Sequence, residues 1–235
     1  MKGGIQSDPE RLTAACVLSV IGGFLDIYTY LYRGKVFANA VTGNMVLFGF
    51  HLAERNWTGS ARYLLAILSY ALGVFLAEVI HGRLSNGRKI SWNQTVILLE
   101  MLCLLPVCFI PYGELDFIVN CLISFVCALQ VQTFRKVHGL PFASTMCTGN
   151  LRSGTEALFH SWKHRGTGDL AKAMHYYGII LCFIFGAAAG AVLLHWAGHL
   201  IFLLIPLGLL TVFLLITPRR QLVGWRRRLR ALRGK

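Results

Sequence analysis

Apolar residues gather in eight blocks along the chain, and short polar or charged stretches separate the blocks. They cover residues 12–32, 36–53, 63–80, 92–110, 115–134, 140–159, 174–194 and 201–216. Several approach the roughly 20 residues that a helix needs to cross a bilayer. The pattern predicts an all-α fold, a polytopic membrane helix bundle, whose first block is a retained span rather than a cleaved signal peptide.

The second and sixth blocks are the weakest candidates to span. Each carries a Thr-Gly-Asn triplet, made of Thr42, Gly43 and Asn44 in one block and Thr148, Gly149 and Asn150 in the other. Basic residues flank the sixth block on both sides, which by the positive-inside rule places both of its ends on one side of the membrane. We therefore expect this block to re-enter the membrane or to lie at its interface.

Two topologies follow, according to what the second block does. If it also re-enters, the chain has about six spans with both termini inside; if it spans, there are seven and the N-terminus is outside. Charge counting does not separate them, because each topology leaves four basic residues outside: Arg33, Lys35, Arg55 and Arg62 with six spans, and Lys2, Arg11, Arg55 and Arg62 with seven. Symmetry favours six, because each half then has three spans and the halves are inverted relative to each other.

The triplets belong to a longer internal repeat. Residues 19–44 and 124–150 match in outline, and each stretch ends in Thr-Gly-Asn. Duplicated transporter folds place their binding sites where such halves meet. We interpret residues 1–217 as one membrane domain, with repeat one at about 12–110 and repeat two at about 115–216.

Each triplet is predicted to begin a broken or re-entrant helix, at residues 45–53 and 151–164. A Thr can cap a helix N-terminus, Gly permits close approach, and Asn both donates and accepts hydrogen bonds. The positive ends of the two helix dipoles would then face inward, toward a polar or anionic group. The alternative is plain helix packing, in which small and polar residues are common.

Ionisable and amide side chains inside the apolar blocks are further candidates for a substrate-binding site, because a charge in hydrocarbon is costly. Asp26 is predicted to be a substrate-contacting or proton-linked carboxylate, and Glu100 is a second candidate. Gln130 and Gln132 fall close to the position of Asp26 in the second repeat. Arg152 and Glu156 lie one helical turn apart and form either an anion contact or an ion pair. For Asp26 the alternative is a hydrogen-bonded structural role.

Composition fits a membrane protein, since 55% of the 235 residues are hydrophobic and 14% are charged, against about 25% charged in soluble domains. The net charge of +13 is concentrated in residues 218–235, which hold eight of the 23 Lys and Arg residues and no acid. This basic tail is expected to be cytoplasmic and to lie on anionic lipid. We expect no nucleic-acid partner, because no soluble domain presents these charges.

No catalytic motif is visible, so we expect neither an enzyme nor a bound cofactor or metal. The seven cysteines form no CxxC pair and are interpreted as buried, unlinked thiols. Gly186 and Gly190 form a GxxxG motif that permits close helix packing. That packing is either internal to the bundle or the contact of a homodimer.

Residues 22–49 (GGFLDIYTYLYRGKVFANAVTGNMVLFG) and 124–158 (SFVCALQVQTFRKVHGLPFASTMCTGNLRSGTEAL) resemble the YoaK-like family of bacterial multi-pass membrane proteins, a family of unknown function. The resemblance extends over about residues 10–217. Ile27 departs from the Ala that is common in this family. Residues 129–132 read Leu-Gln-Val-Gln, where many members have Leu-Gln-Asn-Ala. The Asn is therefore absent, and Gln132 is the residue expected to take over any role it had. The resemblance implies a bacterial inner membrane and about six helices, but no substrate.

Three functions are consistent with these features. The first is a small secondary transporter or permease-like protein for a small polar or anionic solute, with a site lined by Asp26, Asn44, Asn150 and Gln130. The second is a scaffold or sensor that acts through helix packing and the basic tail. The third is a channel with the triplets at its constriction.

Overall fold

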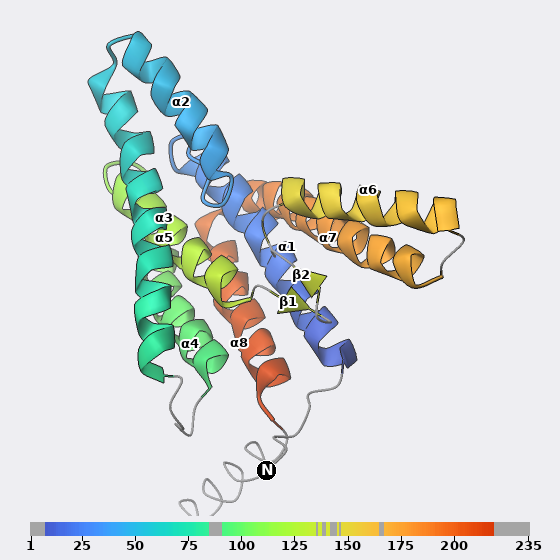
Figure 1. The fold of residues 1–235 in the computed structure, drawn as a ribbon. Coiled ribbons are helices and arrows are strands. Elements are labelled where there is room, and N and C mark those ends of the chain that lie inside the picture. The colour runs from blue at the N-terminus through green and yellow to red at the C-terminus, as the bar shows by residue number, and fades with distance from the viewer. Residues whose placement is uncertain are drawn as a thin grey trace, which may run out of the picture.

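The computed structural model describes residues 8–84, 91–134, 136–137, 140–141, 145, 147–164 and 167–218, and these form a helical bundle (Figure 1). The first half contains α1 (Asp8–Tyr32), α2 (Val41–Ala53), α3 (Trp57–Leu84), α4 (Trp92–Leu104) and the 3₁₀ helix η1 (Pro106–Phe109). The second half contains α5 (Asp116–Thr133), the paired strands β1 (Lys136–Val137) and β2 (Leu140–Pro141), α6 (Cys147–His164), α7 (Thr167–Ala197), the 3₁₀ helix η2 (Gly198–Leu203) and α8 (Leu204–Ile216). The all-α prediction is confirmed, apart from this pair of two-residue strands.

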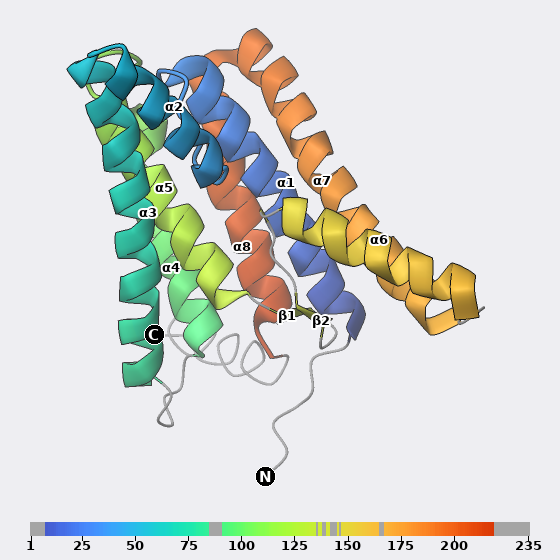
Figure 2. The same ribbon diagram turned by 45° about the horizontal axis from the view of Figure 1, so that its top comes forward.

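Five stretches in the described part of the chain are long and apolar enough to cross a membrane: Leu12–Tyr32, Trp57–Arg83, Trp92–Phe109, Asp116–Thr133 and Gly168–Ile216. The last stretch contains both α7 and α8, and the chain turns back at η2 between them (Figure 2). With its 13 residues, α2 is about 20 Å long, shorter than the hydrocarbon core of about 30 Å. The structure is therefore consistent with six spans and gives no support for α2 as a seventh.

The helices that carry the triplets begin earlier than predicted. α2 starts at Val41 and α6 at Cys147, so each triplet lies within the first turn of its helix instead of preceding it. The predicted capping by Thr is wrong for α2. Its N-cap residue is Ala40, and this residue makes no side-chain hydrogen bond that caps the helix. The physical reason lies in α1, which supplies the carboxylate of Asp26 as an acceptor just before the helix begins.

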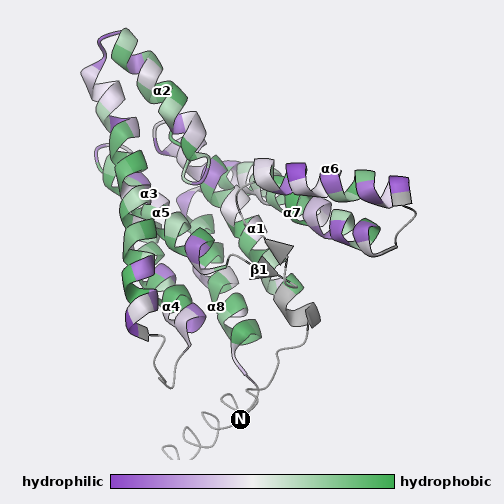
Figure 3. Ribbon diagram, viewed as in Figure 1, coloured by the Kyte–Doolittle hydropathy of each residue, from purple (hydrophilic) through white to green (hydrophobic). Residues whose placement is uncertain are grey.

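α6 is also displaced along the chain from the predicted apolar block, and it extends to His164. Figure 3 shows alternating hydrophilic and hydrophobic residues along α6, whereas α8 is almost continuously hydrophobic. α6 packs along α7, and the two form a hairpin that projects from the bundle (Figure 1). Its polar character agrees with the prediction that this segment does not cross the membrane.

The helices of the two halves pack in matching pairs. α1 packs on α7 as α3 packs on α5, α2 packs on α3 as α6 packs on α7, and α1 packs on α8 as α4 packs on α5. α1 and α5 run in opposite directions (Figure 2). These pairs are the ones expected if α1–α4 and α5–α8 are inverted copies, so they support the two-repeat interpretation.

Glycines make the closest of these contacts. A Cβ on Gly186 of α7 would overlap the carbonyl oxygen of Val20 on α1, and a Cβ on Gly73 of α3 would overlap that of Phe125 on α5. Val20 and Phe125 each follow the serine that opens a copy of the repeat. Gly190 packs on α1 as well, so the GxxxG face is occupied within the bundle, and a homodimer through it would require α1 and α7 to separate.

Arg33 joins the end of α1 to the segment between η1 and α5. Its buried guanidinium donates hydrogen bonds to the carbonyl oxygens of Ile110 (2.6 Å) and Pro111 (2.7 Å) and pairs with Asp116 at 2.8 Å. It also lies over the ring of Tyr112, which contacts His199. One of the positive charges that counted against the six-span topology is therefore neutralised internally.

Candidate functional site

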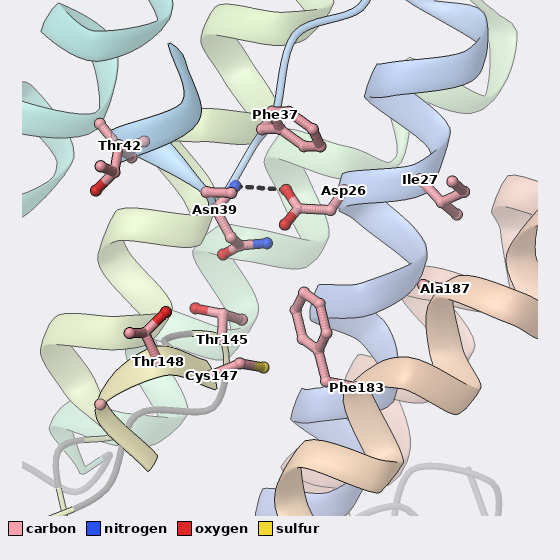
Figure 4. Close-up of a pocket in the computed structure, with 13 residues that line it drawn as sticks. Asp26, Ile27, Phe37, Asn39, Thr42, Thr145, Cys147, Thr148, Phe183 and Ala187 are labelled. Atoms are coloured by element: carbon pink, nitrogen blue, oxygen red, sulfur yellow. Dashed lines mark hydrogen bonds between the residues drawn. The ribbon is translucent and has the colours of Figure 1, made fainter. Parts of the chain in front are cut away.

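A cavity of about 420 Å³ lies where the first turns of α2 and α6 meet α1 and α7 (Figure 4). The described residues that line it are Asp26, Ile27, Phe37, Asn39, Ala40, Val41, Thr42, Thr145, Cys147, Thr148, Gly149, Phe183 and Ala187. Both halves of the chain contribute, and both Thr-Gly-Asn triplets have residues in the lining. The cavity thus lies at the predicted junction of the halves.

Asp26 lies beside the loop that leads into α2. Its Oδ1 accepts a 2.7 Å hydrogen bond from the backbone N–H of Asn39, and the N–H groups of Ala38 and Ala40 also interact with the carboxylate. The side chain is 7% exposed. The carboxylate therefore faces the positive end of the α2 dipole, which is the position of an anion at a helix N-terminus.

Asn44, the last residue of the first triplet, holds the same loop in shape. Its side chain accepts a hydrogen bond from the backbone N–H of Phe37 (2.9 Å) and donates one to the carbonyl oxygen of Phe37 (2.6 Å). This pair of bonds fixes Phe37 beside the cavity, where its ring also stacks on Tyr30 at 4.6 Å. Asn44 itself does not line the cavity, so its contribution to the site is to position Phe37.

Asn39 and Thr145 approach the cavity from the two halves, and each contacts Gly22 of α1. The amide of Asn39 donates to the carbonyl oxygen of Gly22 at 3.2 Å, and a Cβ on Gly22 would overlap the methyl group of Thr145. The side-chain oxygens of Asn39 and Thr145 are buried and have no hydrogen-bond partner among the described residues. Glycine at this position leaves the room that the side chain of Thr145 occupies.

The first turn of α6 forms the opposite wall. Cys147, Thr148 and Gly149 line the cavity, and the space where a Cβ of Gly149 would lie is open. The glycine of the first triplet differs, because a Cβ on Gly43 would touch the ring of Phe37 at 3.1 Å. Burial, with a smaller contribution from the negative charge of Asp26, raises the pKa of the Cys147 thiol to about 11, so this thiol is uncharged at neutral pH.

The remaining wall is apolar and comes from Ile27 on α1 and from Phe183 and Ala187 on α7 (Figure 4). Gly23 brings the two helices together here, because a Cβ at this position would overlap the backbone of Phe183. The cavity therefore combines polar groups at the two helix ends with an apolar side.

Several residues predicted to bind substrate lie outside the lining. Gln130 is buried and donates to the carbonyl oxygen of Leu18 at 3.3 Å, which ties α5 to α1. Gln132 donates to the carboxylate of Glu78 on α3. Asn150 is buried in α6 next to the lining residue Gly149, and it is not itself part of the lining. None of these three side chains lines the cavity, so the structure does not support the prediction that they contact a solute bound there.

Glu100 and the pair of Arg152 and Glu156 are also separate from the cavity. Glu100 is fully buried in α4, and neither carboxylate oxygen has a hydrogen-bond partner in the described part of the chain. Arg152 and Glu156 are exposed on α6, and among the described residues no ion pair joins them. The structure thus brings Asp26, Thr42, Thr148 and Gly149 together and leaves the other predicted residues elsewhere.

Asn39 and Thr145 are two hydrogen-bonding residues of the lining that the sequence did not predict as part of the site. A signal for them exists, because each lies five residues before the Asn of its triplet. Polar side chains at this shared offset extend the likeness between the two stretches that end in Thr-Gly-Asn. Phe37, Phe183 and Ala187 carried no such signal, since apolar residues are common throughout the spans.

These features define a multi-pass helical membrane protein with a cavity between the N-terminal ends of α2 and α6. The chain belongs to the family described as "Protein of unknown function (DUF1275)", whose model matches residues 14–216. It is similar to the UPF0700 transmembrane protein YoaK of Bacillus subtilis (strain 168), with 27% identity over 151 residues that cover 63% of this chain and 67% of the relative. No solved structure matches the chain.

Proposed function

We propose that this protein is a small secondary transporter and that the cavity at Asp26 is its substrate site. The observation that carries the proposal is the convergence of the first turns of α2 and α6 on one cavity of about 420 Å³ beside a buried carboxylate. Transporters built from inverted repeats bind their substrates between the repeats, at the ends of interrupted helices. The matching helix contacts of the two halves support the same interpretation.

The proposed orientation places the protein in a bacterial inner membrane with the C-terminal end in the cytoplasm. The loops at Arg33, Tyr112 and His199 lie together at one end of the bundle, and that end would face outward. The basic tail, which would bind anionic lipid, lies outside the described residues beyond Pro218. The scaffold hypothesis depends on this tail, whereas the cavity favours transport.

The test uses access to the cavity and needs no knowledge of the substrate. In a chain whose seven cysteines are replaced by serine, Thr148→Cys is labelled with a membrane-impermeant maleimide in right-side-out and inside-out vesicles. A transporter exposes its site to each side in turn, so we expect labelling from both sides. Labelling from one side only would reject transport through this cavity.

Two controls make the result specific. Glu114→Cys, in the loop before α5, should be labelled from one side only. Purified Thr148→Cys protein in planar bilayers should carry no steady ion current, because a transporter does not expose the cavity to both sides at once. A steady current that labelling at Thr148→Cys blocks would identify a channel instead.

A further inference from the structure

The charge inside the cavity is balanced, and this restricts what can bind. Asp26 is the only formally charged residue among the described residues of the lining. Each helix N-terminus contributes roughly half a positive charge, and the first turns of α2 and α6 contain no acidic residue. The carboxylate and the two helix ends therefore nearly cancel, so a solute with a net charge would remain uncompensated in a poorly solvated site.

The balanced charges are nevertheless separated in space. Asp26 lies against the loop before α2, while the first turn of α6 forms the wall across the cavity (Figure 4). When residues 19–44 are aligned with residues 124–150, Asp26 falls opposite Val131 or Gln132. The second stretch therefore has no acidic residue at the position of Asp26. One side of the cavity is thus negative and the other side positive.

Two side-chain oxygens without a hydrogen-bond partner among the described residues define which groups a solute must offer. Asn39, 7% exposed, and Thr145, 6% exposed, line the cavity with oxygens that have no partner among the described residues. The oxygen of Asn39 can only accept a hydrogen bond, so a donor is required next to Asp26. A buried polar atom left unpaired costs about 1–3 kcal/mol, which a bound solute would recover.

The side of the cavity formed by α6 suits a hydrogen-bond acceptor. The open space at Gly149 lets a solute approach the backbone of the first turn closely, and the N–H groups there point away from the helix toward an acceptor. Thr145 and Thr148 add hydroxyl groups on the same side. The ring of Phe183 provides an apolar surface between the two ends, and the ring of Phe37 provides another beside Asp26.

We propose that the cavity binds a small zwitterion, an α-amino acid with an apolar side chain. Its ammonium group lies between Asp26 and Asn39, its carboxylate at the first turn of α6, and its side chain against Phe37 and Phe183. The inference rests on the proposed function in one respect, since it names the substrate class of that same site. It also narrows the expected polar or anionic solute to one that carries both charges.

Calorimetric titration of the full-length chain in lipid nanodiscs tests the proposal with three matched probes. L-Phenylalanine has both charged groups, phenethylamine lacks the carboxylate, and 3-phenylpropanoate lacks the ammonium. We expect phenylalanine to bind and each analogue to bind at least tenfold more weakly. Equal binding of either analogue, or the absence of binding by phenylalanine and leucine at millimolar concentration, would overturn the proposal.

Variants assign the binding to this cavity. Asp26→Asn and Asn39→Ala should each weaken phenylalanine binding at least tenfold, and Thr145→Val, which keeps the shape of the side chain, should weaken it severalfold. Gly149→Ala places a methyl group in the open space and should also weaken binding, while the helix itself gains from alanine. Gly178→Ala on α7, where the space is open but outside the lining, is the matched control and should bind as the wild type does.

The outcomes separate the two proposals. Labelling of Thr148→Cys from both sides without phenylalanine binding would keep the transporter and reject the zwitterion. Phenylalanine binding that Asp26→Asn abolishes, together with labelling from one side, would keep the substrate class and reject transport. If Asp26→Asn fails to fold, Thr145→Val and Gly149→Ala still decide whether the probe occupies this cavity.

Discussion

Arg33 shows how a single side chain can hold several elements together. It is completely buried and donates to Tyr28, Pro111, Asp116 and Ile110. The fork of a guanidinium suits such a set, because its donors point in fixed directions. The residue thereby connects the end of α1 to the segment between η1 and α5.

We expect Arg33→Ala to lower the free energy of unfolding by about 3–5 kcal/mol, because it leaves Asp116 and two backbone carbonyl groups without their partner. Arg33→Lys should recover only part of this loss, since an ammonium group cannot reach all the acceptors. Detergent-based unfolding of the purified chain measures both changes. Arg62→Ala is the control: Arg62 is exposed and donates a hydrogen bond to the carbonyl oxygen of Gly34 at 3.1 Å, and its loss should cost less than about 0.5 kcal/mol.

Single residues were predictable from the sequence only where their chemistry conflicted with their surroundings. Asp26 stands out as a charge within an apolar block, and it does line the cavity. Arg33 did not stand out, because it lies at the edge of a block where an exposed cation is ordinary. Its burial depends on acceptors that are about eighty residues away in the chain, and no local pattern contains that information.

At the scale of elements, α1 and α7 lie close because glycines remove the side chains between them. Gly23 and Gly186 each place backbone against backbone, and Gly73 does the same between α3 and α5. Close backbone approach of this kind is how helices associate in lipid, where the hydrophobic effect does not drive them together. The contact of Gly186 with α1 and the contact of Gly73 with α5 are counterparts if the halves are copies.

We expect Gly186→Ala and Gly73→Ala each to destabilise the bundle by about 1–3 kcal/mol, because the added methyl group would overlap a backbone carbonyl that cannot move alone. Thermal unfolding in detergent gives the comparison. Gly178→Ala, on the same helix as Gly186 but facing open space, should leave the melting temperature unchanged or raise it. Equal effects at all three positions would mean that helix propensity, and not packing, decides the stability.

The order and type of the elements followed from the hydrophobic pattern, whereas their boundaries did not. The sixth block was predicted at 140–159, but α6 is the amphipathic helix Cys147–His164. Its polar residues, among them Arg152 and Glu156, are compatible with a helix that packs on α7 alone, and hydropathy does not mark its end. The triplets fell inside the first turns for a similar reason, since Asp26 of another helix satisfies the start of α2.

At the scale of the whole molecule, the cavity is less symmetric than the fold. Its long-helix walls are α1 and α7, which provide Ile27, Phe183 and Ala187, and neither α3 nor α5 contributes a described lining residue. Inverted repeats can exchange conformations, which opens the site to the other side of the membrane. If Gly73 and Gly186 correspond, Val74 on α3 takes the place of Ala187 in the exchanged state.

We therefore expect Ala187→Cys and Val74→Cys, each in a chain without other cysteines, to react with an impermeant maleimide from opposite sides of the membrane. Both positions are partly exposed and follow a glycine of the helix contacts directly, so the two variants are matched in their surroundings. Since only one of the two walls can line the cavity at a time, a treatment that slows labelling of Ala187→Cys should accelerate labelling of Val74→Cys. If both cysteines react from the same side, or if Val74→Cys never reacts, the halves do not exchange, and the cavity at Asp26 keeps α1 and α7 as its long-helix walls.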